Sequence, residues 1–116
     1  MMQVASDLGM AIEFDADGRW FIDRLGRRVS LTRTRVTQRL VKALVARWQK
    51  SPGAPIPTRE IFDIGWDSAN IRHASAQSRV YMAMSRLRAL GLGKVLTYGR
   101  TGYFLEPGAV RVRADA

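Results

Sequence analysis

The stretch RVYMAMSRLRALGL, from Arg79 to Leu92, combines an apolar stripe with three arginines and reaches a glycine near its end. At about 100° per residue, a helix that starts near Ser75 would have one apolar side and one side of mostly small residues. The apolar side consists of Ala76, Val80, Ala83, Met84 and Leu87. The opposite side consists of Ser75, Ser78, Met82, Ser85 and Ala89. We therefore expect a helix over about residues 75–90, with one face in a core and the other available to a partner.

Arginines border the outer side of this expected helix. Arg79 and Arg86 lie two turns apart on one edge, and Arg88 lies with Tyr81 on the other. Long side chains at the border of a helix can reach guanine edges or phosphates when the helix enters the DNA major groove, which is about 12 Å wide. Short serines such as Ser78 would let the helix approach closely, and Met82 would contact a thymine methyl group. The alternative is a solvated helix flank with one isolated exposed methionine.

Positive charge is concentrated in the same part of the chain. The 116 residues include 19 basic and 10 acidic side chains, which gives a formal net charge of +9. Residues 1–31 contain four basic and five acidic groups, residues 32–70 seven and three, and residues 71–116 eight and two. Sixteen of the basic residues are arginine, the side chain that makes bidentate contacts with phosphate and guanine. The pattern favours a polyanionic partner, nucleic acid before membrane, over a basic surface that only maintains solubility.

Alternating apolar residues predict a small antiparallel sheet in the first part of the chain. AIEF (11–14) and RWFID (19–23) flank a turn that contains an Asp-Gly pair, and RRVSL (27–31) follows a second turn. An Asp-Gly pair between two alternating runs is a strong hairpin signal. A strand platform is therefore expected over residues 10–31. Its buried face should contain Trp20, Ile22, Val29 and Leu31.

Two further helices are expected before the stretch quoted first. Thr32 has the side chain of an N-cap, and the apolar positions after it recur at four-residue steps, which predicts a helix over about residues 32–50. These positions are Val36, Leu40, Leu44 and Trp48. SPGAPIP (51–57) contains a breaker pair and is expected to be a loop. Thr58 then caps a helix over residues 58–66.

The last part of the chain predicts a β-hairpin over about residues 94–106. KVLTYG and TGYFLEP flank Arg100, which would lie at the hairpin tip between glycines. An arginine there suits the narrow minor groove of DNA, and the alternative is a solvated turn residue. The tail, residues 107–116, is expected to be loose or to form a short extra strand.

Three more arginines are candidates for contact with DNA phosphates: Arg72, Arg33 and Arg35. The free amides at the start of the helix that follows Thr32 would also accept a phosphate. Taken together, the elements predict a single α+β domain over residues 1–116. Its order is strands, three helices and a hairpin.

The stretch from Leu31 to Pro107 resembles the winged helix-turn-helix DNA-binding domain of the OmpR/PhoB type of bacterial response regulators. The matching segments are LTRTRVTQRLVKALV, IPTREIFDIGW, SRVYMAMSRLRALGL and VLTYGRTGYFLEP. The most specific parts are SRLR and the T-x-x-x-T-G-Y pattern of the wing. In two respects the chain departs from the family: Gly99 precedes Arg100 in the wing, where the family usually has arginine before glycine, and these 116 residues include no receiver domain. A stand-alone binder and a fragment of a longer chain are both compatible with the second departure.

The resemblance implies DNA reading from the outward face of the third helix. Met82, Arg86 and Arg88 then occupy possible reading positions, with Ser78 and Arg79 near the entering end. The wing that contains Arg100 is implied to contact the minor groove. Tyr103 matches the structural aromatic residue of the wing. The loop over residues 67–74 corresponds to a segment that contacts RNA polymerase or another regulator.

Other classes of function find less support in the sequence. His73 is the only histidine and there is no cysteine, so a metal site and a thiol nucleophile lack ligands, and no cofactor is expected. No catalytic motif is present, and we expect no enzymatic activity. No secretory signal or apolar run of ~20 residues occurs, so a cytoplasmic protein without membrane attachment is expected.

The sequence therefore predicts a cytoplasmic, nucleoid-associated protein that binds specific double-stranded DNA and regulates transcription. Binding as a homodimer or in tandem is an open extension, because one small module has limited area for discrimination. A winged-helix module for protein–protein interaction, with no specific DNA site, is the alternative.

Overall fold

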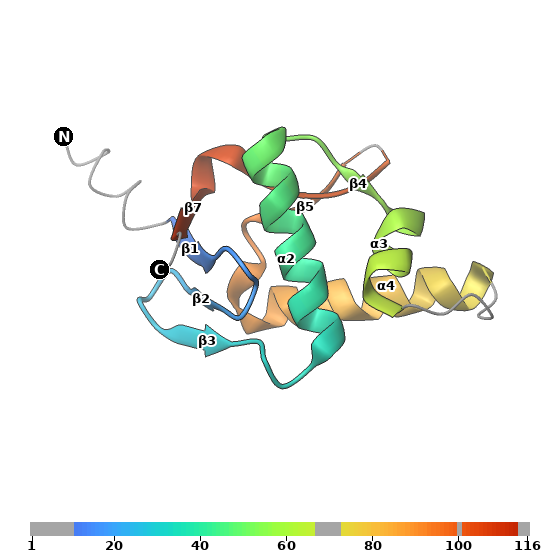
Figure 1. The fold of residues 1–116 in the computed structure, drawn as a ribbon, viewed down its shortest axis with the longest axis horizontal. Coiled ribbons are helices and arrows are strands. Elements are labelled where there is room, and N and C mark those ends of the chain that lie inside the picture. Colours follow the sequence, from blue (N-terminus) through green and yellow to red (C-terminus); the bar gives the residue numbers. More distant parts are fainter. Residues whose placement is uncertain (1–10, 67–72, 100, 114–116) are drawn as a thin grey trace.

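The computed structural model describes residues 11–66, 73–99 and 101–113. These residues form three α-helices and two small sheets, and the predicted mixed α+β class is confirmed (Figure 1). The strands are β1 (Ile12–Asp15), β2 (Trp20–Ile22), β3 (Arg28–Ser30), β4 (Ile56–Pro57), β5 (Leu96–Gly99), β6 (Gly102–Leu105) and β7 (Val110–Arg113). The helices are α2 (Arg35–Lys50), α3 (Thr58–Trp66) and α4 (His73–Leu87), with the π-helical turn η1 (Arg88–Leu92) and the 3₁₀ turn η2 (Pro107–Ala109).

The first sheet has the strand order β3-β2-β1-β7. Strands β1 to β3 are antiparallel, as the sequence predicts, and the β1–β2 turn closes through a 2.9 Å bond from the Gly18 amide to the Asp15 carbonyl. Gly18 has φ +75°, a conformation that glycine adopts without strain. Strand β7 adds to β1 in parallel, with Ile12 opposite Val110. The C-terminal segment is thus an extra strand of the platform, one of the two alternatives for the tail.

The predicted buried face of this sheet is wrong by one residue in β2. Phe21 pairs with both Phe14 and Val29 and is fully buried, whereas Trp20 pairs with Ser30 on the opposite face. Because side chains alternate with a period of two, a shift of one residue in register exchanges the faces of a strand. Trp20 and Ile22 therefore do not share a face with Val29.

Trp20 is nevertheless covered, because arginine side chains lie over it. The guanidinium carbons of Arg28 and Arg113 are 4.6 and 5.4 Å from the centre of its ring. Stacking of this kind lets an indole on the outer face of a sheet avoid water while the arginines keep their hydration.

Helix α2 begins three residues later than the sequence predicts. Thr34, not Thr32, occupies the N-cap position, and its side chain makes no capping hydrogen bond. Thr32 lies in the preceding turn, where its hydroxyl oxygen is 3.1 Å from that of Ser30. The buried residues of α2 are Thr37, Leu40, Val41, Leu44 and Val45. Helix α3 has the predicted bounds.

Helix α4 starts two residues before the predicted Ser75. Its helical geometry ends at Gly91, which has φ +137° inside the π-helical turn. An added Cβ at Gly91 would lie 3.2 Å from the Phe21 ring, so the glycine also allows the first sheet to pack closely.

The second sheet has the order β4-β6-β5 and contains the predicted hairpin. Strand β4 lies in a segment for which the sequence predicts a loop. Its residues Ile56 and Pro57 pair with Tyr103 and Gly102. An added Cβ at Gly102 would overlap the carbonyl oxygen of Ile56, so this pairing requires glycine.

One hydrophobic core joins the helices to both sheets. Helix α4 contributes Val80, Met84 and Leu87, each at most 1% exposed. Helix α4 crosses the start of α2 and the end of α3 (Figure 1). Among the described residues, no helix has the length and apolar character needed to cross a membrane.

Candidate nucleic-acid interface

The outer face of α4 is open to solvent, as the spacing of its residues predicts. Ser75, Ser78 and Met82 are exposed, and Met82 retains 61% of its accessible surface. Ala76 and Leu87 on the inner side are at most 6% exposed, while Ala83 is half-buried. Because α4 contains no acidic residue, the charge of its arginines is not neutralised within the helix.

The edge of α4 that faces α2 carries Arg79 and Arg86. Both side chains are exposed, and neither makes a hydrogen bond or ion pair with any residue that the structure describes. They border a hollow of about 310 Å³ between α4, the first turn of α2 and the end of α3. Its lining consists of Thr34, Val36, Thr37, Trp66, Ser78, Arg79, Met82, Ala83 and Arg86. We call this hollow the α2–α4 groove.

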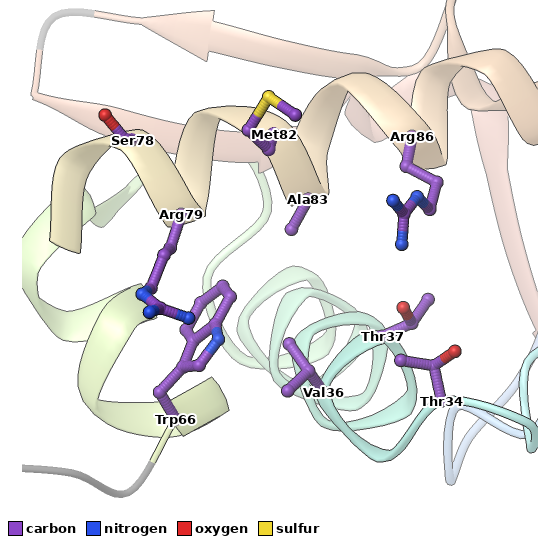
Figure 2. A pocket seen from close by; sticks show the side chains of 9 residues that line it. All are labelled: Thr34, Val36, Thr37, Trp66, Ser78, Arg79, Met82, Ala83 and Arg86. Atoms are coloured by element: carbon purple, nitrogen blue, oxygen red, sulfur yellow. The ribbon is translucent and has the colours of Figure 1, made fainter. Parts of the chain in front are cut away.

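Side-chain directions differ along α4. Figure 2 shows Arg79 and Arg86 extending toward the α2–α4 groove, with Arg79 beside Trp66 and Arg86 above Thr37. Ser78 and Met82 point away from α2 in the same view. The two arginines therefore point in a different direction from Ser78 and Met82.

The other edge of α4 continues into η1, whose first residue, Arg88, joins it to the β5–β6 hairpin. Its Nε and Nη2 atoms donate hydrogen bonds of 3.3 and 3.2 Å to the Leu96 carbonyl oxygen. Its guanidinium carbon also lies 5.9 Å from the centre of the Tyr103 ring. Burial raises the pKa of the Tyr103 hydroxyl above its usual value. Arg88, which the resemblance assigns to a reading position, has its hydrogen-bonding capacity partly used within the protein.

Two exposed tyrosines lie near Arg88. Tyr81 on α4 and Tyr98 on β5 are 62% and 56% exposed, and both line a second hollow of about 430 Å³ between α4 and the hairpin. The ring of Tyr98 meets that of Tyr103 edge-on at 4.9 Å. No role for Tyr98 is predicted from the sequence. Its two-residue spacing from the buried Leu96 predicts that both side chains lie on the same face of β5. Which residues of that face are buried and which are exposed depends on the position of α4.

The remaining predicted site residues are distributed around this surface or lie outside the described residues. Arg33 is exposed in the turn before α2, and Arg35 is the exposed first residue of that helix. The first turn of α2 contains no acidic residue. Arg72, Arg100 and most of the predicted partner-binding loop 67–74 lie outside the described residues.

The acidic residues of the platform compensate its arginines. Asp15 is 1% exposed and accepts hydrogen bonds of 2.7 and 2.9 Å from the Nε and Nη2 atoms of Arg19. This ion pair lowers the pKa of the Asp15 carboxyl group below its usual range. Arg113 donates one hydrogen bond of 2.8 Å from its Nε atom to the Glu13 carboxylate. The platform therefore has less uncompensated charge than its arginine content suggests.

No metal centre is found within the described part of the chain, where no three His, Cys, Asp or Glu side chains group as ligands would. The fold and this surface define a small α+β protein that presents one arginine-edged helix and one hairpin to solvent. The chain matches no protein-family model, no curated protein and no solved structure. Its function is therefore inferred from the geometry of this surface.

Proposed function

We propose that this chain is a winged helix-turn-helix protein that binds specific double-stranded DNA and regulates transcription. In this proposal α3 and α4 form the helix-turn-helix, α4 enters the major groove, and the β5–β6 hairpin is the wing. The observation that carries it is the solvent-exposed surface of α4. Arg79 and Arg86, which have no described partners, lie on its α2-side edge, Met82 is exposed on its outer face, and the helix contains no acidic residue. Arginine and methionine suit phosphates, guanine edges and thymine methyl groups.

The arrangement around α4 supports this proposal. The hairpin follows α4 after the short turn η1, and Arg88 at the start of η1 bonds to the Leu96 carbonyl of the hairpin, so α4 and the hairpin can face one ligand. The resemblance to the OmpR/PhoB type rests on the same order of elements. It further suggests that Arg100 contacts the minor groove and that the segment 67–74 contacts RNA polymerase or another regulator. A cytoplasmic location and a dimeric or tandem mode on DNA belong to the same proposal.

The test is selection from a random duplex library by the purified protein, at two salt concentrations. We expect enrichment of one motif and a steep loss of affinity as salt increases, with a log–log slope of about −0.9 per neutralised phosphate. Arg100→Ala should weaken binding to the selected site with little change in major-groove preference. Recovery of no motif, together with weak salt dependence, would contradict the proposal.

A protein–protein interaction module is the second candidate. Tyr81, Met82 and Tyr98 are all more than half exposed, and tyrosine and methionine are enriched in the cores of protein interfaces. A largely apolar interface would lose little affinity with salt. Binding of a protein partner that is abolished by Tyr81→Ser and insensitive to salt, without duplex binding, would favour this candidate.

A further inference from the structure

Arg86 and Thr37 face each other across the α2–α4 groove, and each lacks a described partner. Thr37 lies in the first turn of α2, is only 8% exposed and lines the groove, yet its hydroxyl makes no hydrogen bond with any described residue. In Figure 2 the guanidinium of Arg86 extends from α4 toward the Thr37 and Thr34 side chains on α2. The Thr37 side chain is largely buried, but its hydroxyl is not among the buried polar atoms without a partner, so it is accessible from the groove. A hydroxyl and a guanidinium that share a hollow without bonding each other leave room for an acceptor between them.

The backbone of α2 adds donors at the same place. The Thr34 side chain does not cap the helix, and no acidic residue lies in the first turn. The first backbone bond of the helix runs from the Gln38 amide to the Thr34 carbonyl, 3.1 Å, so the amides before Gln38 lack helical partners. The Thr37 hydroxyl, the Arg86 guanidinium and these amides are all donors, and the positive end of the helix dipole favours an anion.

We infer that the α2–α4 groove binds a backbone phosphate of the DNA and that Arg86 holds this phosphate instead of reading a base. The inference rests on the proposed function and changes the assignment of residues within it. Base reading then belongs to the side chains that point away from α2, Ser78 and Met82. Arg79 lies two turns from Arg86, about 10 Å along the helix axis, and would contact a different phosphate of the same strand.

Removal of the phosphate contact should lower the affinity for every duplex by the same factor. Arg86→Ala should lower the affinity for the selected site and for an unrelated duplex by the same factor, about tenfold. The salt slope should fall by about 0.9, the value for one phosphate. Thr37→Val keeps the shape of the side chain without its hydroxyl and should lower the affinity for both duplexes a few-fold. Thr37→Ser keeps the hydroxyl and should bind like the wild type. Lys50→Ala, which removes an exposed charge at the other end of α2, is the control and should change neither quantity.

A second measurement identifies the phosphate and distinguishes a DNA phosphate from free inorganic phosphate. The affinities of the wild type and of Arg86→Ala are measured for duplexes in which one phosphate at a time is replaced by a neutral methylphosphonate. At one position of one strand, the wild type should lose about tenfold and the variant almost nothing. Inorganic phosphate at the concentration of the duplex should not compete.

The outcomes separate the inference from the proposed function. If the wild type binds a motif but Arg86→Ala changes the preference at one base pair and leaves unrelated duplexes unaffected, Arg86 reads a base. The inference then fails while DNA binding stands. Additive losses at every methylphosphonate position would overturn it in the same way. A wild type that binds no duplex would overturn both.

Discussion

The two edges of α4 carry the same kind of side chain and use it differently. On the hairpin side, Arg88 donates two hydrogen bonds to the Leu96 carbonyl and lies against Tyr103. On the α2 side, Arg79 and Arg86 reach over a hollow and bond to no described residue. An arginine becomes part of the fold where a neighbouring segment offers an acceptor, and it remains available to a ligand where no segment does.

The first sheet extends this comparison. Arg19 holds the buried Asp15, and Arg28 and Arg113 cover Trp20. These arginines contribute to the net charge of +9 but satisfy groups of the protein itself. A count of charges therefore overstates the charge available to the proposed DNA-binding surface, and the side chains without described partners define that surface better.

The largest expected effect comes from disrupting the pairing of β6 with β4, which holds the hairpin beside α4. Gly102→Ala should destabilise the protein by roughly 3 kcal/mol or more, because the new methyl group would overlap the backbone of β4. Urea unfolding measures the effect. Gly108→Ala is the matched control, since no atom lies within 4 Å of a Cβ added there. Equal unfolding midpoints for the two variants would contradict the packing of β6 on β4.

The next effect concerns the ion pair between Arg19 and the buried Asp15. Asp15→Asn should destabilise the protein by about 1–3 kcal/mol at pH 7, because the bidentate acceptor of Arg19 is lost. The pKa of Asp15 is lowered by folding, so its contribution is complete above the unfolded pKa of about 4 and disappears as pH falls through the lower, folded value.

Unfolding measured from pH 7 to pH 2 tests the contribution of Asp15. The wild type should lose stability more steeply than Asp15→Asn below about pH 4. Parallel curves for the two proteins would show that the ion pair does not stabilise the folded state.

A smaller effect is expected at Arg88. Arg88→Ala should lower the free energy of unfolding by about 1 kcal/mol, because the Leu96 carbonyl and the Tyr103 ring lose their contact with the guanidinium. Arg88→Lys should recover only part of this stability, since lysine lacks the planar fork of donors. An unchanged unfolding midpoint in Arg88→Ala would remove the distinction between the two edges.

The smallest effect on stability is expected at the α2-side edge. Arg79→Ala should change the free energy of unfolding by no more than about 0.5 kcal/mol, as is usual for exposed side chains without partners. Thermal unfolding beside Arg88→Ala makes the comparison directly. A loss at Arg79 as large as that at Arg88 would mean that both edges serve the fold.

Local patterns were sufficient to predict several elements. The four apolar positions of α4 with at most 6% exposure are those that helical spacing predicts, and α3 has the predicted bounds. The Asp-Gly turn between β1 and β2 was also predicted, because glycine at positive φ is a property of the turn itself. By contrast, α2 begins at Arg35 and not near Thr32, since both threonines suit an N-cap and the preceding turn selects between them.

The sequence by itself determined the periodicities, the concentration of arginine and the outer face of α4, because each depends on residues close together in the chain. The tertiary structure decided the register of β2, the parallel pairing of β7 and the strand at Ile56, since each depends on a distant segment. The tertiary structure also places a carbonyl acceptor within reach of Arg88, whereas Arg86 extends into the α2–α4 groove without a described partner. The chain determines which side chains can bind, and packing determines which of them are already satisfied.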